Sequence, residues 1–167
     1  MILLSNRHIP LGLAAALSCA LAAPANADLL VQKNLSAAMA VEAAMVTIAT
    51  CKANGFAVSV TVVGRNGEPI VQIRGDGTGP HTTENSFKKA YTSRTFRIPS
   101  GEMEKRFKDN PQLGAVFLSN ITTGRGALPI AVGQEVIGAI GASGAPGGDK
   151  DEACVKAGID KIAGQLK

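Results

Sequence analysis

Residues 56–74 read F-A-V-S-V-T-V-V-G-R-N-G-E-P-I-V-Q-I-R. Asn66-Gly67 separates a run rich in β-branched residues from a second apolar run. Asn-Gly between two such runs is the strongest short-range signal for a β-hairpin, because both residues tolerate positive φ. The stretch therefore predicts strands over 56–63 and 69–74, and a hairpin implies an antiparallel sheet.

Helical patterns lie on both sides of this hairpin. Residues 30–54 carry apolar side chains at a spacing of three to four and end at Gly55. The other predicted elements are a helix between His81 and Pro99, a short helix or irregular crossover over 101–110, strands over 127–132 and 135–140, and a helix over 149–166. One antiparallel sheet flanked by long helices predicts an α+β fold rather than a Rossmann-like fold.

The first 27 residues have the features of a secretory signal peptide. An apolar run over 11–23 precedes Ala25-Asn26-Ala27, the small-x-small pattern at which such leaders are cleaved. The alternative is a lipoprotein leader cut before Cys19, but no large aliphatic residue stands three positions upstream of that cysteine. We expect residues 28–167 to form a single exported domain, periplasmic or secreted, with no transmembrane segment.

The charge of the chain is weakly basic. Seventeen Lys and Arg face 13 Asp and Glu, giving a net charge of +4. The basic residues form no cluster, so the composition argues against a nucleic-acid partner. It is compatible with a ligand that carries carboxylates.

Two cysteines, Cys51 and Cys154, remain outside the leader. An exported protein meets an oxidising compartment, where an even pair usually forms a disulfide, and two buried free thiols are the alternative. The chain has no C-x-x-C motif, which argues against a thioredoxin-like role, and no C-x-x-C-H motif for covalent haem attachment.

A glycine-rich loop with a single histidine follows the hairpin. Gly75, Gly77 and Gly79 alternate before Pro80, and His81 then opens a helix-compatible segment. Glycine tolerates positive φ and helix N-termini favour anions, so this junction can face a ligand. His81 is the only histidine of residues 28–167. The alternative is an exposed loop histidine without function.

Other motifs carry less weight. The loop 75–79 lacks the spaced acids of a calcium loop. Ser143 has no partner for a triad other than the lone histidine. Lys88 and Lys89 are interpreted as a solvated helix face. The acids at 149, 151 and 152 are interpreted as charges that suit a helix N-terminus.

Several short motifs occur together in a characteristic order. They are Val60–Val63 with Asn66-Gly67, Arg74–Gly77, Lys89–Thr92, Leu128–Ile130, Gly138–Gly144, Asp151-Glu152 and Ala157-Gly158. In this order and spacing the chain resembles the GlcG/HbpS family of small haem-binding and related proteins, over nearly all of residues 28–167. The resemblance implies a profilin-like α+β fold, dimers or larger assemblies and, for several members, haem binding. One departure is Gly124-Arg125-Gly126, where the family has paired glycines.

With this resemblance, His81 becomes the candidate ligand of haem iron, since imidazole is a common proximal ligand. Tyr91 is a further possible oxygen ligand or pocket wall, and Phe87 a possible apolar contact. Arg94 and Arg97 could pair with propionates, because guanidinium groups suit carboxylates. The alternative is that this helix simply packs Phe87 and Tyr91 into the core.

The leading hypothesis is an exported protein that binds haem or a similar tetrapyrrole non-covalently, for storage, delivery or redox sensing, as a homo-oligomer. One alternative is an enzyme that degrades haem or acts on a small hydroxy acid, although the sequence offers no second histidine and no obvious pair of acids. The other alternative is an accessory or assembly module that binds a partner protein and no cofactor.

Overall fold

The centre of the protein is an antiparallel sheet of four strands in the order β2-β1-β4-β3. A computed structural model describes residues 28–167. Its strands are β1 (Ser59–Val63), β2 (Pro69–Ile73), β3 (Ala127–Val132) and β4 (Glu135–Ser143). The hairpin predicted from the sequence is present, with β1 paired to β2 and Gly67 at φ +84° in the turn.

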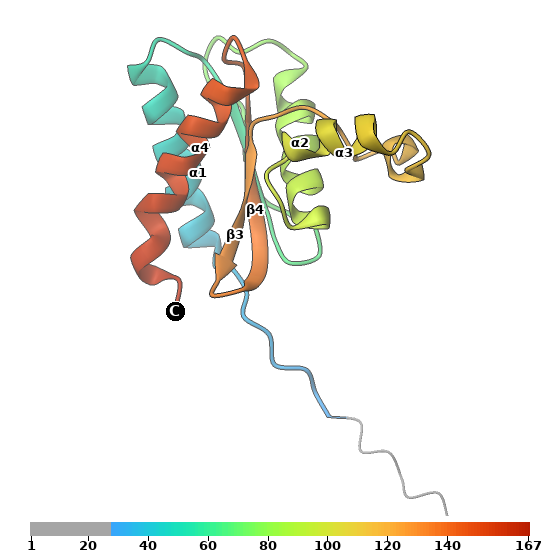
Figure 1. Ribbon diagram of the computed structural model, residues 1–167. Helices are drawn as coiled ribbons and strands as arrows, with labels where there is room; N and C mark the ends of the chain where they lie inside the picture. The colour runs from blue at the N-terminus through green and yellow to red at the C-terminus, as the bar shows by residue number, and fades with distance from the viewer. Residues whose placement is uncertain (1–27) are drawn as a thin grey trace, which may run out of the picture. The chain divides into compact units, whose positions relative to one another are not determined.

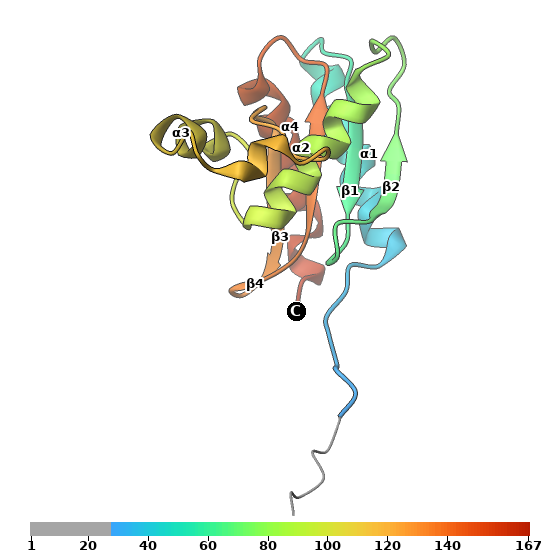
Figure 2. The ribbon, with the colours of Figure 1, turned by 90° about the vertical axis from the view of Figure 1, so that its right-hand side faces the viewer.

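Helices cover both faces of the sheet, as Figures 1 and 2 show. The pair α1 (Ala37–Ala53) and α4 (Gly148–Ile162) lies on one face, and α2 (Thr82–Phe96) lies on the other. Shorter elements are α3 (Glu102–Asp109) and the 3-10 helices η1 (Gly114–Phe117) and η2 (Ala163–Gln165). The predicted α+β fold, an antiparallel sheet flanked by helices, is confirmed.

The apolar core lies between the sheet and the α1–α4 pair. These two helices approach closely because small residues face each other. A Cβ added at Gly158 would lie 2.3 Å from the Thr47 hydroxyl oxygen and 2.5 Å from the Ala43 carbonyl oxygen. A disulfide between Cys51 and Cys154, with Cα atoms 5.5 Å apart, joins the same helices. The first and last long helices are therefore held together both by packing and by a covalent bond.

The opposite face of the sheet packs on α2 through hydroxyl groups. Ser59 bonds to Thr82 at 2.7 Å, and Thr61 bonds to Ser86 at 2.8 Å, all four side chains being buried. The helix also comes close to β4, since a Cβ added at Gly141 would lie 2.5 Å from the Ser86 carbonyl oxygen. The interface between α2 and the sheet is thus polar and closely packed rather than apolar.

The inward face of α2 differs from the sequence interpretation. Phe87 and Tyr91, which one interpretation of the sequence packs into the core, are only partly buried. The buried residues are Thr82, Ser86, Lys89, Ala90, Thr92 and Ser93. Large apolar side chains do not fit here, because the helix axis lies too close to the glycine of β4.

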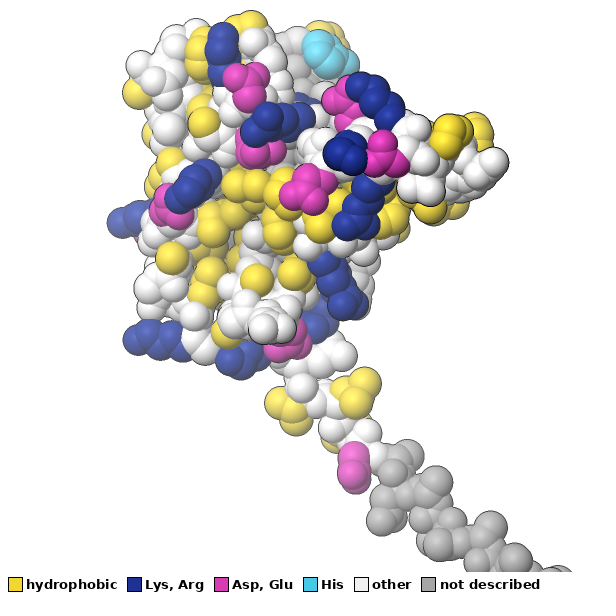
Figure 3. Space-filling model, viewed as in Figure 1, with side chains coloured by type: hydrophobic (Ala, Val, Ile, Leu, Met, Phe, Trp, Pro, Cys, Tyr) yellow, Lys and Arg dark blue, Asp and Glu magenta, His cyan; other side chains and the backbone are white. Residues whose placement is uncertain are grey.

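An arm made of residues 99–126 projects from the body between α2 and β3 (Figures 1 and 2). It contains a helix, α3, where the sequence allowed a short helix or an irregular crossover. Met103 is fully buried and anchors its base. Val116, Phe117 and Leu118 are exposed, and Figure 3 shows hydrophobic side chains at the tip of the arm.

Element ends differ modestly from prediction. The first helix begins at Ala37, seven residues later than expected, because the Ser36 hydroxyl accepts the Met39 amide at 3.2 Å and caps it. Strand β4 continues to Ser143, where it still pairs with Ser59 of β1. Residues 32–167 form one compact unit. The expected leader, residues 1–27, lies outside the described residues, and none of the described helices is long and apolar enough to cross a membrane.

Candidate ligand-binding cleft

A cleft of about 700 Å³ opens at the end of the sheet where β4 finishes and where α2 and α4 begin. Its walls are two glycine-rich loops, residues 75–81 before α2 and residues 144–148 before α4. Both loops need glycine, since Gly77 and Gly144 have φ values of +75° and +139°. The backbone thus bends around the cleft without side chains that would fill it.

His81 stands on the rim of this cleft, at the N-cap position of α2. Its side chain is exposed and makes no hydrogen bond within residues 28–167. A Cβ at Gly79 would lie 3.0 Å from the imidazole Cε1, so the loop packs against the ring. His81 also borders a second, smaller hollow of about 250 Å³. Histidine is visible at the surface in Figure 3.

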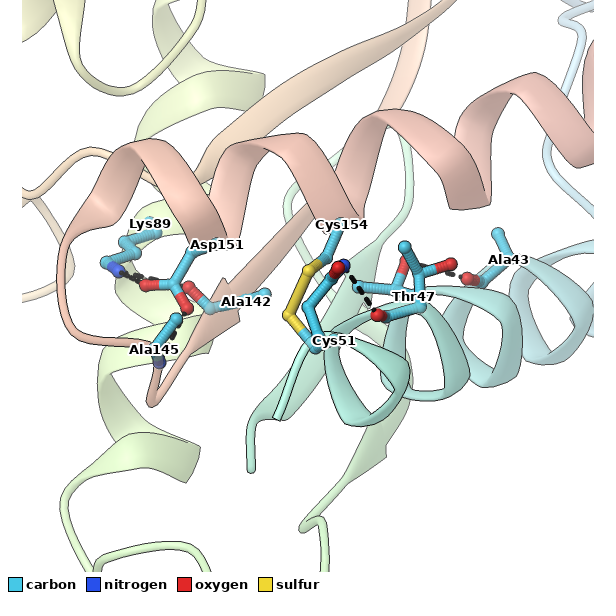
Figure 4. Close-up of a disulfide and its surroundings, with 10 residues drawn as sticks. Ala43, Thr47, Cys51, Lys89, Ala142, Ala145, Asp151 and Cys154 are labelled. Carbon is cyan, nitrogen blue, oxygen red and sulfur yellow. Dashed lines mark hydrogen bonds and ion pairs between the residues drawn. A yellow bond between two sulfur atoms is a disulfide. The ribbon is translucent and has the colours of Figure 1, made fainter. Parts of the chain in front are cut away.

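A buried ion pair borders the inner part of the cleft. Lys89 Nζ lies 2.8 Å from Asp151 Oδ2 and donates to the Ala142 carbonyl oxygen at 3.0 Å. The other carboxylate oxygen of Asp151 accepts the Ala145 amide at 3.0 Å (Figure 4). The side chains are only 6% and 3% exposed. The pair therefore joins α2, the end of β4 and the start of α4.

Burial controls the ionisation of this pair. Removal from water raises the pKa of Asp151, while the charge and hydrogen bond of Lys89 and the Ala145 amide hold it down, and burial is the largest effect. Only glycine fits beside the pair at position 126, because a Cβ there would lie 2.8 Å from Asp151 Cβ and 2.9 Å from Lys89 Nζ. The partners of Asp151 thus offset the effect of burial on its pKa only in part.

The sequence interpretation was wrong for Lys89 and incomplete for Asp151, which does lie in the first turn of α4. Lys89 is not on a solvated face, and Asp151 is more than a charge at a helix N-terminus. Lys88 does lie on the surface and pairs with Glu84 at 2.6 Å. A usable signal was the spacing of Thr82, Ser86, Lys89 and Ser93 at three or four residues, which marks one buried polar stripe.

Two more polar side chains lie beside the pair. Asn85 Nδ2 donates to the Ser143 hydroxyl oxygen at 2.9 Å, and Ser143 is 3% exposed. Asn85 is one helical turn before Lys89, so both project from the same side of α2. At the outer edge, Arg125 makes a two-point ion pair with Glu152, at 2.8 and 3.1 Å. Charged groups that line the cleft are thus Lys89, Arg125 and Asp151.

The other predicted site residues do not line the cleft. The Phe87 ring packs against Tyr91 at 5.7 Å between centroids, and Tyr91 covers Gly67 in the hairpin turn. Tyr91 is ten residues beyond His81, which corresponds to about 15 Å of helical rise. Arg97 ends the helix in the left-handed conformation at φ 59°. The structure therefore separates His81 from the four residues predicted to accompany it.

Arg94 has an unusual environment at that far end of α2. Its Nε atom is buried and lacks a hydrogen-bond partner within the described residues. Burial lowers the pKa of Arg94, and the charges of Arg97 and Arg65 lower it further. The prediction that Arg94 and Arg97 meet carboxylates stays a prediction, at a place distinct from the cleft.

Fold and cleft together define a small α+β domain with a glycine-walled polar cleft at one end of an antiparallel sheet. The family model described as "Haem degrading protein HbpS-like" matches residues 35–160. The chain therefore belongs to the HbpS-like family, as its sequence motifs predicted. No protein with a curated description matches the chain.

Solved structures share this fold. A double mutant of Streptomyces reticuli HbpS is 32% identical, with a TM-score of 0.77 over 84% of this chain and 97% of that one. Klebsiella pneumoniae protein ORFY is 23% identical, with a TM-score of 0.75 over 84% and 98% of the two chains. A PduOC:heme complex is 19% identical, with a TM-score of 0.70 over 77% and 94%, and shares the fold.

Proposed function

We propose that the protein binds haem or a related tetrapyrrole non-covalently, with His81 as the iron ligand. The setting is the periplasm or the outside of the cell, after removal of residues 1–27, and the role is storage, delivery or redox sensing by a homo-oligomer. The observation that carries the proposal is the position of His81, an exposed imidazole without a hydrogen-bond partner in residues 28–167, on a rim shared by two hollows.

The donor chemistry fits this group. A neutral imidazole is a common proximal haem ligand, and neither nitrogen of His81 is engaged by a described residue. Residues 28–167 contain no group of three or more His, Cys, Asp or Glu that could hold a bare metal ion, so a single protein ligand favours an iron already held by a macrocycle. Haem would supply the iron; the chain supplies the imidazole and the glycine-walled space beside it.

The relatives support the ligand class. The family description names haem, and one solved relative of the same fold is a haem complex. The disulfide between Cys51 and Cys154 agrees with an oxidising compartment. These observations favour export and haem chemistry together.

The test is a haem titration of the purified protein, followed by the Soret band, beside His81→Ala and the matched control Tyr91→Phe. We expect saturable binding in the wild type and in Tyr91→Phe, and a changed Soret position with weaker binding in His81→Ala. Identical spectra and affinities in the wild type and His81→Ala would remove His81 from the site. Loss of binding in Tyr91→Phe alone would move the ligand to the far end of α2. No binding by any variant would favour an accessory module without a cofactor.

The same sample separates binding from degradation, which the family description raises. When a reductant and oxygen are added, a protein that only binds haem should keep its Soret band. The only change should be the shift that follows from reduction of the iron. Steady loss of that band, with formation of an open-chain product, would instead show haem-degrading activity.

A further inference from the structure

Three donor side chains at the inner end of the cleft keep unused hydrogen-bonding capacity. Lys89 Nζ has three N–H groups and uses two, on Ala142 and Asp151. Asn85 Nδ2 has two and uses one, on Ser143. The Ser143 hydroxyl accepts that bond and donates to no residue within 28–167. Each of the three therefore has one donor left for a ligand.

These donors lie close together. Asn85 and Lys89 are one turn apart on α2. Asn85 contacts the Ser143 hydroxyl, and Lys89 contacts the carbonyl of Ala142, the preceding residue of β4. All three side chains line the same cleft. Two are almost completely buried, with Lys89 at 5% and Ser143 at 3% exposure.

Among the described residues that line the cleft, Asp151 is the one carboxylate. Both oxygens of Asp151 are already engaged, one by Lys89 and the other by the Ala145 amide. The starts of α2 and α4 also border the cleft, and helix N-termini favour negative charge. The ammonium group of Lys89 is buried, and its third N–H can donate to a further acceptor.

We propose that Asn85, Lys89 and Ser143 form a subsite for a carboxylate at the inner end of the cleft. A carboxylate has two acceptor oxygens, which suits a charged donor beside two neutral ones. The carboxylate belongs either to a propionate of a bound tetrapyrrole or to a free small carboxylic acid. Only the first source rests on the haem-binding proposal.

The first experiment uses free ligands and needs no haem. Nuclear magnetic resonance of the 15N-labelled protein follows the Asn85 side-chain amide and the Ser143 backbone amide during titration with sodium propionate. The control ligand is propionamide, which has a similar shape and no charge. We expect saturable shifts with propionate alone. Asn85→Ala and Ser143→Ala should each weaken binding about tenfold, the usual effect of one hydrogen bond to a charged group. Ser119→Ala, on the arm, is the matched control and should bind as the wild type does.

The second experiment identifies the source. If the subsite holds a haem propionate, haem dimethyl ester should bind about tenfold more weakly than haem in the wild type, and the difference should shrink in Ser143→Ala. If the source is a free acid, propionate shifts appear while ester and acid bind equally. Equal binding of both haems together with no saturable propionate shift would overturn the subsite.

The His81→Ala variant keeps the two proposals distinguishable. It should retain the propionate shifts even where its Soret band changes, because His81 belongs to the rim and not to the donor group. Thermal unfolding of Asn85→Ala and Ser143→Ala, expected near the wild type, verifies that these variants are folded.

Discussion

Replacing Lys89 by methionine should destabilise the protein, and the loss of stability relative to the wild type should grow as the pH rises. Methionine keeps the apolar stem and removes the ammonium group, so Asp151 stays buried with the Ala145 amide as its remaining partner. Burial already raises the pKa of Asp151 in the wild type, and Lys89 is the main influence that lowers it. In the variant the pKa of Asp151 must therefore rise further.

The sign follows from linkage. A carboxyl group whose pKa is higher in the folded than in the unfolded state binds more protons when folded, so stability is lost as pH rises from the unfolded pKa of about 3.9 through the folded pKa. The free energy of unfolding that Lys89→Met loses relative to the wild type should be smallest near pH ~4. This loss, the deficit of the variant, should grow by up to about 1.4 kcal/mol per pH unit. It should level off once the folded carboxyl ionises, in the range of about 3–5 kcal/mol for a broken buried ion pair.

The measurement is urea unfolding of the variant and the wild type at several pH values between about 4 and 8, so that groups common to both cancel in the difference. Asp151→Asn serves as the matched partner, since it removes the titrating carboxyl and keeps the size of the side chain beside Lys89. Because the wild type itself loses stability as its raised carboxyl ionises, the stability loss of Asp151→Asn relative to the wild type should shrink as pH rises, opposite in sign to that of Lys89→Met. The reasoning is refuted if the Lys89→Met deficit is independent of pH, or if Asp151→Asn shows the same pH dependence.

Two further predictions concern the α1–α4 pair. Reducing the bond between Cys51 and Cys154, which are 103 residues apart in sequence, should lower the free energy of unfolding by about 4.7 kcal/mol in the chain-entropy estimate, measured by urea unfolding with and without a reductant. A change below about 1 kcal/mol would contradict it. Gly158→Ala should cost about 1–3 kcal/mol, because its Cβ would meet Thr47. Gly164→Ala, which has open space around it, is the control and should melt within a few degrees of the wild type.

Local signals were sufficient for the sheet and the long helices. Asn66-Gly67 between two apolar runs specifies the hairpin through turn chemistry, which acts within a few residues. The inward face of α2 could not be found by looking for large apolar positions. There, Gly141 brings the helix so close to β4 that serine and threonine fill the interface and bond to one another. Such packing depends on a residue far away in the chain.

The candidate site was likewise predicted only in part. His81 was identified because a lone histidine after a glycine loop is a local pattern, and the structure places it on a cleft. The inner end was missed, since Lys89 and Asp151 are 62 residues apart and meet only after α2 and α4 pack on the sheet. The spacing of Thr82, Ser86, Lys89 and Ser93 indicates a polar stripe on α2, but it does not identify Asp151 as the partner of Lys89. Gly126 leaves room for the pair, and this role could not be predicted because it depends on contacts that form only in the folded protein.

The strand order also limits how copies of the protein can meet. Because β2 and β3 are the edge strands, the sheets of neighbouring copies could pair edge to edge only along one of these two strands. Each carries a proline, Pro69 in β2 and Pro129 in β3, and proline has no N–H to offer a new neighbour. Polymerisation by strand addition is thereby disfavoured at both borders. Contacts made through the helices or the projecting arm are not subject to this limit.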